Sequence, residues 1–248
     1  MRELVHLAEF QAILESPKHK YQPSDESQAI VRQTRMALFV GPTNAGRNTI
    51  INKLIPKGSY YFVISDTTRP PKLRNGVTEQ DGVEYWFRKE KDVLSDLKTG
   101  RFVEAAIIHE QQVSGMSVRE IAIAQAQNKV AVTDIEIVGV ESVRAIKPDV
   151  ICIFVLPPSF EQWQRRLNKR DDISVTELAR RMRSSIREFT AALKHPYYWF
   201  VMNNDLTEAT DYVDQLVKTG KPDPDKQAEG RAIAEDLLRQ TKQFLEDM

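Results

Sequence analysis

The sequence predicts an α/β protein with a mostly parallel sheet, because short apolar runs alternate with segments of helical character. These runs do not alternate between apolar and polar residues, as expected for strands that are buried on both faces. The candidate strands span residues 36–40, 60–64, 130–132, 150–155 and 199–202. Because helical segments separate them, we expect right-handed crossovers between parallel strands.

Three helix starts follow from a serine with an acid or amide three positions later, the pattern of a capping box. These serines are Ser117, Ser159 and Ser174. Apolar residues at helical spacing also predict a helix near each end of the chain, and a polar stretch leads to the first strand. The N-terminal stripe, which we expect to pack on the domain or on a partner chain, consists of Leu4, Leu7, Phe10, Ile13 and Leu14. We therefore predict an N-terminal extension at 1–33, a central domain at 34–220 and a C-terminal helical extension at 221–248.

Composition limits the classes of partner. With 248 residues and 41% hydrophobic content, the chain suits one α/β domain with extensions. Its 35 Lys and Arg residues balance 35 Asp and Glu residues, so no overall field favours nucleic acid or an acidic membrane. The single cysteine, Cys152, lies in an apolar run and is interpreted as a buried hydrophobe in a reducing compartment. No membrane-length apolar run or secretory signal is present, so we expect a cytoplasmic protein.

A phosphate-binding loop is predicted directly after the first strand, at residues 41–49. It has the glycine frame of a Walker A loop, with Arg47 where lysine is expected and Asn48 where serine or threonine is expected. Glycines allow backbone amides to point inward, and the N-terminus of the following helix favours phosphate oxygens. An ordinary turn between a strand and a helix is the alternative for this segment taken alone.

Further motifs follow this loop in order. The segments 65–72 and 82–87 resemble the GMP-phosphate clamp of guanylate kinases, and 100–104 resembles their guanine-binding segment. The similarity runs from about residue 37 to about residue 218. It implies a P-loop nucleoside monophosphate kinase fold, with a GMP-binding insertion at about 65–127 and a helical lid at about 160–187.

The resemblance implies one set of residues for each nucleotide. The implied ATP-binding residues are Gly41, Thr43, Asn44, Ala45, Gly46, Arg47, Asn48, Thr49 and Asn203. The implied GMP-binding residues are Ser65, Arg69, Lys72, Tyr85, Glu104, Ser114, Asp134 and Glu136. Guanine presents neighbouring N1–H and N2–H donors, so a carboxylate such as Glu104 favours it over adenine.

The clamp departs from the family at three places. Lys72 replaces a second arginine, and Ser114 occupies the position of a second phosphate-binding tyrosine. The stretch 73–80 is also longer than the usual turn. A solvated basic loop is the alternative interpretation of this segment.

The resemblance assigns catalysis to Arg47 and to two lid arginines, Arg170 and Arg181, which would neutralise charge on the transferring phosphoryl group. An arginine-rich helix is otherwise usually a solvated face. Asn48 and Asp134 are weak candidates for holding Mg²⁺, Asp134 through water.

The predicted activity is guanylate kinase, with Mg²⁺-bound ATP and GMP as substrates, no nucleic-acid or membrane partner, and an oligomeric state left open. The alternative is a non-catalytic guanylate-kinase-like module, because scaffolding proteins of this kind also carry arginine in the phosphate loop and the sequence Thr-Thr-Arg-Pro-Pro-Lys in the clamp.

Overall fold

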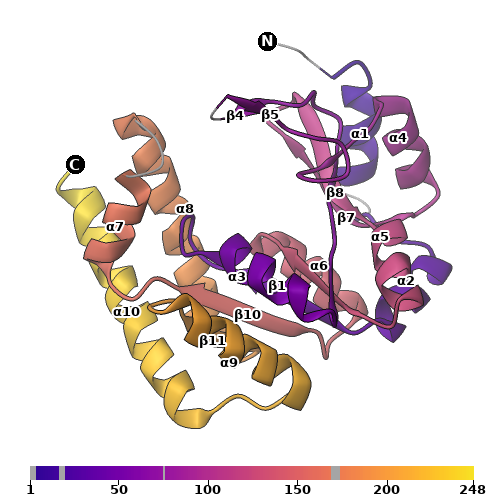
Figure 1. The fold of residues 1–248 in the computed structure, drawn as a ribbon. Helices are drawn as coiled ribbons and strands as arrows, with labels where there is room; N and C mark the ends of the chain where they lie inside the picture. The colour runs from indigo at the N-terminus through magenta and orange to yellow at the C-terminus, as the bar shows by residue number, and fades with distance from the viewer. Residues whose placement is uncertain (1–3, 17–19, 75, 169–173) are drawn as a thin grey trace. The chain divides into compact units, whose positions relative to one another are not determined.

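A computed structural model describes residues 4–16, 20–74, 76–168 and 174–248 (Figure 1). Its largest sheet has five strands in the order β11-β10-β1-β9-β2. Their bounds are Met36–Val40 for β1, Tyr60–Phe62 for β2, Val130–Asp134 for β9, Ile151–Leu156 for β10 and Tyr198–Met202 for β11. The strand β10 pairs in parallel with both β1 and β11. The α/β class and all five predicted strands are therefore confirmed.

A second sheet has four strands in the order β6-β3-β8-β7. They span Asp66–Thr67 (β3), Trp86–Phe87 (β6), Phe102–Ile108 (β7) and Gln112–Ser117 (β8). The strands β4 (Leu73–Arg74) and β5 (Val77–Thr78) form a separate antiparallel pair within the stretch that is longer than the family's usual turn.

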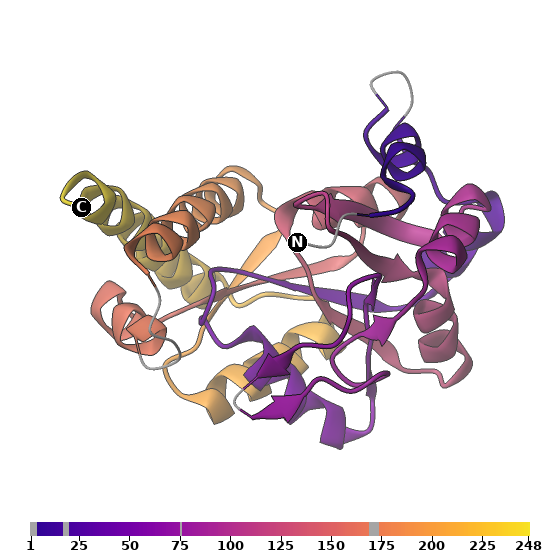
Figure 2. The same ribbon diagram turned by 90° about the horizontal axis from the view of Figure 1, so that it is seen from above.

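The chain divides into two compact units. The first unit comprises Met1–Arg35, Tyr61–Ala131 and Glu141–Asp149, and the second comprises Met36–Tyr60, Val132–Val140 and Val150–Met248. Helices of the first unit are α1 (Leu7–Leu14), α2 (Asp25–Gln33), α4 (Glu90–Lys98) and α5 (Val118–Ala126). Helices of the second unit are α3 (Arg47–Leu54), η1 (Ile55–Lys57), α7 (Phe160–Asn168), α8 (Val175–Lys194), α9 (Leu206–Thr219) and α10 (Pro224–Glu246), and α6 (Ile137–Ile146) contributes to both units. Figure 2 gives a second view of the same elements.

The N-terminal stripe packs on its own chain. Leu4 and Phe10 are buried in a cluster, against which Leu7, Ile13 and Leu14 also pack. The other buried members of this cluster are Val93, Leu94, Leu97, Phe102 and Val113. The predicted packing of the stripe on the domain is confirmed. The polar stretch expected after it contains the helix α2, which begins where the side chain of Ser24 accepts a bond from the Ser27 amide at 3.2 Å.

All three predicted serine caps are present, although one serine bonds to a different amide from the one expected. Ser159 and Ser174 each accept a bond from an amide three residues later, at 3.2 Å. Ser117 accepts from the amide of Arg119 instead. The carboxylate of Glu120 is buried, and it accepts bonds from Tyr61, Trp86 and the amide of Ile64. Tertiary contacts therefore take this acid away from the cap.

Two sequence expectations concern burial. Cys152 is a free, buried cysteine, as predicted. The helix α10 contains the predicted C-terminal amphipathic segment and has Leu237 fully buried. Among the helices of the described ranges, none is long and apolar enough to cross a membrane.

Candidate functional site

The predicted phosphate loop connects β1 to α3, and its two glycines occupy positions that larger residues would not tolerate. Gly41 has a φ of 137°, and a Cβ atom there would lie 2.4 Å from the carbonyl oxygen of Val155. Gly46 has a φ of 101°, and a Cβ atom there would meet the side chain of Asn203. That amide donates to the carbonyl of Ala45 at 2.8 Å. The glycine frame therefore allows the loop to lie close to the ends of β10 and β11.

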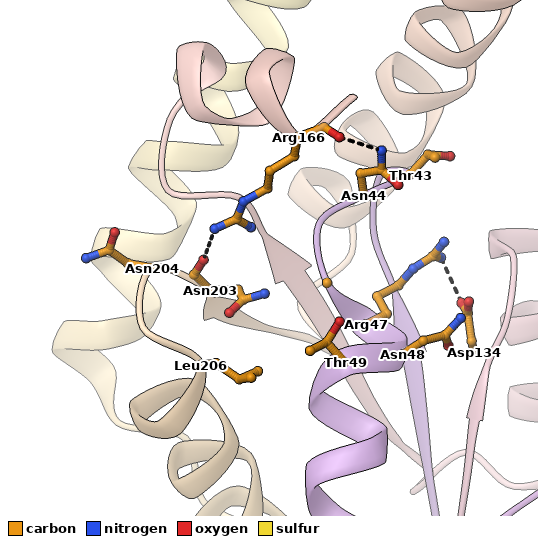
Figure 3. A pocket seen from close by; sticks show the side chains of 11 residues that line it. Thr43, Asn44, Arg47, Asn48, Thr49, Asp134, Arg166, Asn203, Asn204 and Leu206 are labelled. Carbon is orange, nitrogen blue, oxygen red and sulfur yellow. Dashed lines mark hydrogen bonds and ion pairs between the residues drawn. The ribbon is translucent and has the colours of Figure 1, made fainter. Parts of the chain in front are cut away.

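A cavity of about 530 Å³ lies at this loop (Figure 3). Most of the predicted ATP-binding residues line it, and Gly41 and Ala45 are not among the lining residues. The lining residues are Thr43, Asn44, Gly46, Arg47, Asn48, Thr49, Asp134, Arg166, Asn203, Asn204 and Leu206. The structure thus brings the loop, the end of β9 and the segment after β11 together around one space.

Two arginines in this cavity have different partners. Arg47 Nη1 lies 2.9 Å from Asp134 Oδ1, and both side chains remain partly exposed (Figure 3). Arg166 donates to the carbonyl of Asn203 at 2.9 Å, and its own carbonyl accepts from Asn44 at 3.1 Å. Burial lowers the pKa of Arg166 from its usual value, although an arginine stays protonated. Arg166 therefore adds a second cation and also ties α7 to the loop.

Two carboxylates, those of Asp134 and Glu188, interact electrostatically with Arg47. Burial raises the pKa of Asp134, and the positive charge of Arg47 opposes this rise. Burial also raises the pKa of Glu188 to about 7; Arg47 opposes the change, and the charges of Glu136 and Asp134 add to it. The Oε2 atom of Glu188 is buried without a hydrogen-bond partner in the described part of the chain. A cation or donor entering this region would stabilise the charged form of Glu188.

The predicted GMP-phosphate clamp belongs largely to the first unit. Arg69 is buried, forms a two-point ion pair with Glu79 and lies over the ring of Tyr85, with its guanidinium carbon 4.8 Å from the ring centroid. The side chain of Lys72 is exposed. Ser114 donates to the hydroxyl of Thr67 at 2.8 Å. The structure therefore brings Arg69 and Tyr85 together, and it gives Arg69 a carboxylate partner that was not expected.

The residues predicted to contact the guanine base are divided between the units. Glu104 lies on β7 and accepts from the amide of Met116 at 3.1 Å. Ser65 directly precedes β3, and its carbonyl accepts from the Trp86 amide at 3.0 Å. Glu136, the third residue implied for the base, belongs to the second unit and lies just before α6. Asp134, predicted as a GMP-binding residue and a weak Mg²⁺ candidate, ends β9 in the same unit.

Of the two predicted lid arginines, Arg181 lies on α8 and Arg170 lies outside the described residues. Arg181 Nε donates to Glu177 Oε1 at 2.7 Å. Arg180 makes two bonds to the same carboxylate, and together the two arginines hold the pKa of Glu177 at about 2. In the described structure, the predicted catalytic Arg181 is therefore engaged in a partly buried ion pair with Glu177.

Comparisons with known proteins identify the family. The family model described as guanylate kinase matches residues 33–219. A guanylate kinase from Synechococcus sp. (strain JA-3-3Ab) is 31% identical over 193 residues, which cover 76% of this chain and 84% of that protein. This chain belongs to the guanylate kinase family.

Two further similarities support this family assignment. Guanylate kinase 1 of Oryza sativa subsp. japonica is 32% identical over 68% of this chain, and the aligned part spans only 44% of that longer protein. A crystal structure of guanylate kinase from Anaplasma phagocytophilum matches 82% of this chain and 94% of its own, with a TM-score of 0.56 at 20% identity. That match supports the guanylate kinase fold, since identity at this level carries no detail of the site.

Sequence reasoning missed several residues around the cavity of this guanylate kinase family member. Arg166 was not predicted as a site residue, although it lies three residues after Trp163 on the same helix. The side chain of Trp163 donates to the carbonyl of Thr43 in the phosphate loop, and that of Arg166 donates to the carbonyl of Asn203. Asn204 and Leu206 also line the cavity, next to the predicted Asn203. Glu188 carries no local signal, because only tertiary structure brings α8 near Arg47.

Proposed function

We propose that this chain is a guanylate kinase that transfers the γ-phosphoryl group of ATP to GMP, giving ADP and GDP. The observation that carries the proposal is the cavity at the phosphate loop. It combines a glycine-framed turn, the N-terminus of α3 and the cations Arg47 and Arg166. Backbone amides and fixed cations of this kind stabilise the phosphate groups of a nucleotide.

The proposed chemistry depends on positioning and on charge neutralisation. The acceptor phosphate of GMP is already ionised, so no general base is needed for its attack on the γ-phosphorus. Arg47, with the lid residues Arg170 and Arg181, would neutralise charge on the oxygens of the transferring group. Closure of the lid would exclude water and so suppress hydrolysis of ATP.

Magnesium fits this cavity only together with nucleotide phosphates. Mg²⁺ prefers six oxygen ligands and usually keeps several waters beside one or two carboxylates. The cavity offers one carboxylate, that of Asp134, and the neutral side-chain oxygens of several threonines and asparagines, among them Asn48 and Thr49. In the described ranges, no group of three or more His, Cys, Asp or Glu side chains is arranged to hold a metal. Bound with ATP, the ion would be held by Asn48 and, through water, by Asp134, and it would supply positive charge that stabilises the transferring phosphoryl group.

Selection of GMP is assigned to Glu104. Its carboxylate would accept from N1–H and N2–H of guanine, whereas N1 of adenine is itself an acceptor and would be repelled. The same residue accepts from the amide of Met116, which limits its freedom to rotate.

A non-catalytic nucleotide-binding module is the second candidate. The ion pair between Arg47 and Asp134 favours it, because the loop arginine is already neutralised by a carboxylate. A module would bind GMP through the clamp without ever moving a phosphoryl group.

A coupled assay of ADP release decides between the two functions. The full chain is mixed with Mg²⁺, ATP and GMP at increasing protein concentrations, beside reactions that lack GMP or contain AMP instead. A rate that is proportional to protein and requires GMP supports the kinase. GMP binding by calorimetry without ADP release would leave the module as the function.

A further inference from the structure

Arg69, the arginine assigned to the phosphate of GMP, is held by Glu79, an acid outside the predicted site. Glu79 Oε2 lies 2.5 Å from Arg69 Nη1, and Glu79 Oε1 lies 3.0 Å from Arg69 Nη2. The arginine side chain is 7% exposed and the glutamate side chain 3% exposed. Such a buried, two-point pair fixes both the position and the plane of the guanidinium group.

Glu79 also closes the base of the β4–β5 hairpin. Its backbone amide donates to the carbonyl of Lys72 at 2.9 Å, and its side chain accepts from the amide of Lys72 at 2.9 Å. Between these two residues, Leu73 pairs with Thr78 and Arg74 with Val77. The stretch 73–80 therefore contains an antiparallel pair of strands, and Glu79, which directly follows β5, reaches back into the clamp.

The remaining surface of the Arg69 guanidinium is also defined. Nη1 donates to the carbonyl of Pro70 as well as to Glu79. One face lies over Tyr85, with the guanidinium carbon 4.8 Å from the ring centroid. A guanidinium has five N–H donors, and within the described chain the Nε–H and one Nη2–H have no hydrogen-bonding partner in this arrangement. Adjacent donors of this kind suit two oxygens of one phosphate.

We propose that Glu79 is a positioning residue for the acceptor phosphate, acting through Arg69. This inference rests on the proposed assignment of GMP to the clamp. Glu79 holds one edge of the guanidinium so that the other edge meets the phosphate in a fixed orientation. Its contribution is large here, because Lys72 replaces the second arginine and Ser114 the second tyrosine. Arg69 is then the only forked cation among the clamp residues, and its orientation decides how the phosphate binds.

The test compares GMP with guanosine, which has the same base and sugar but no phosphate. Both are titrated calorimetrically into the full chain and into Glu79→Gln, which keeps the size of the side chain and removes its charge. Glu79→Asp keeps the charge on a shorter side chain. Asp96→Asn is the matched control, because it removes a carboxylate from another arginine pair of the same unit, that of Arg88.

We expect Glu79→Gln to weaken GMP binding about tenfold or more, as the loss of one oriented charge-assisted contact would, and to leave guanosine within about twofold. Glu79→Asp should recover part of the loss, and Asp96→Asn should leave the ratio of the two affinities unchanged. In an Arg69→Ala background, Glu79→Gln should have no further effect on GMP, since Glu79 acts through Arg69.

Other results would overturn the inference. Tighter GMP binding by Glu79→Gln would mean that Glu79 competes with the phosphate for Arg69. Equal losses for GMP and guanosine would mean that Glu79 only maintains the fold. Absence of GMP binding by the unmodified chain would overturn the clamp itself. The proposed kinase activity fails separately: without ADP release, a selective effect of Glu79→Gln on GMP would still support the positioning role.

Discussion

Among the arginines proposed to contact phosphate in this protein, Arg47 and Arg69 are each paired with a carboxylate, but in different ways. In the second unit, Arg47 meets Asp134 through one contact, with side-chain exposures of 18% and 26%. In the first unit, Arg69 meets Glu79 through two contacts at 7% and 3% exposure. A single, partly solvated pair can exchange one anion for another at low cost, whereas a buried two-point pair cannot. The comparison suggests that Arg47 changes partner when ligand binds, while Arg69 keeps its partner.

The largest expected difference between the two pairs is in stability. Arg69→Ala leaves the buried carboxylate of Glu79 without its cation and should lower the free energy of unfolding by about 3–5 kcal/mol. Arg47→Ala breaks a partly exposed pair and should cost about 1 kcal/mol. Urea denaturation of the two variants and the unmodified protein measures both values. Equal losses of unfolding free energy in the two variants would show that the buried pair and the partly exposed pair contribute equally to stability.

The next effect concerns phosphoryl transfer. If Arg47 leaves Asp134 to stabilise the transition state, Arg47→Ala should reduce the rate of ADP release by about a hundredfold or more. GMP affinity should stay nearly unchanged, because the GMP phosphate is assigned to the clamp of the first unit. A parallel loss of GMP affinity would show that the two regions are not independent.

Arg47→Lys tests whether the phosphate loop functions with arginine in place of lysine (an adapted loop) or has lost its catalytic function (a decayed loop). An enzyme adapted to the longer, planar arginine should lose activity with lysine, because the two side chains differ in reach and in hydrogen-bonding geometry. A decayed loop should gain activity or remain silent. Steady-state rates at saturating ATP and GMP distinguish these outcomes.

The sequence predicted the five core strands because each is a short apolar run with both faces buried, which is a local property. It also indicated the phosphate loop, because the spacing of the glycines can be recognised in the sequence alone. It could not predict how the arginines pair. Asp134 and Glu79 lie 87 and 10 positions from their partners, and nothing local distinguishes these acids from solvated ones. The helix α2 was missed because its sequence is largely polar and its cap is Ser24 without an acid at the third position.

The base-recognition part of the clamp gives a smaller effect. Glu104→Gln should lower the affinity for GMP by about 1–3 kcal/mol, because a charge-assisted contact to guanine is lost. Calorimetric titration with GMP and AMP measures the change in selectivity. Equal affinities of the unmodified protein for the two nucleotides would remove Glu104 from its proposed role.

The smallest effect is a pH dependence in the Arg47 region. Burial raises the pKa of Glu188 to about 7 from an ordinary value of 4.5, so the folded state binds more protons than the unfolded state between these two pH values. Stability must therefore fall as the pH rises through this window and become constant above it. Because neighbouring water reduces the effect, we expect Glu188→Gln to gain about 1–2 kcal/mol relative to the unmodified protein between pH 5 and pH 8.

Denaturation at several pH values measures this gain, and Glu141→Gln is the control, because Glu141 is an exposed helix residue. The control should show no pH-dependent difference.

Nucleotide binding extends the comparison between the two arginines. If Arg47 turns from Asp134 toward a phosphate group, the neighbouring carboxylates lose a cation and gain an anion, and the pKa of Glu188 should rise further. A pKa of Glu188 that is unchanged by ATP would mean that Arg47 keeps its carboxylate partner, as Arg69 is inferred to do.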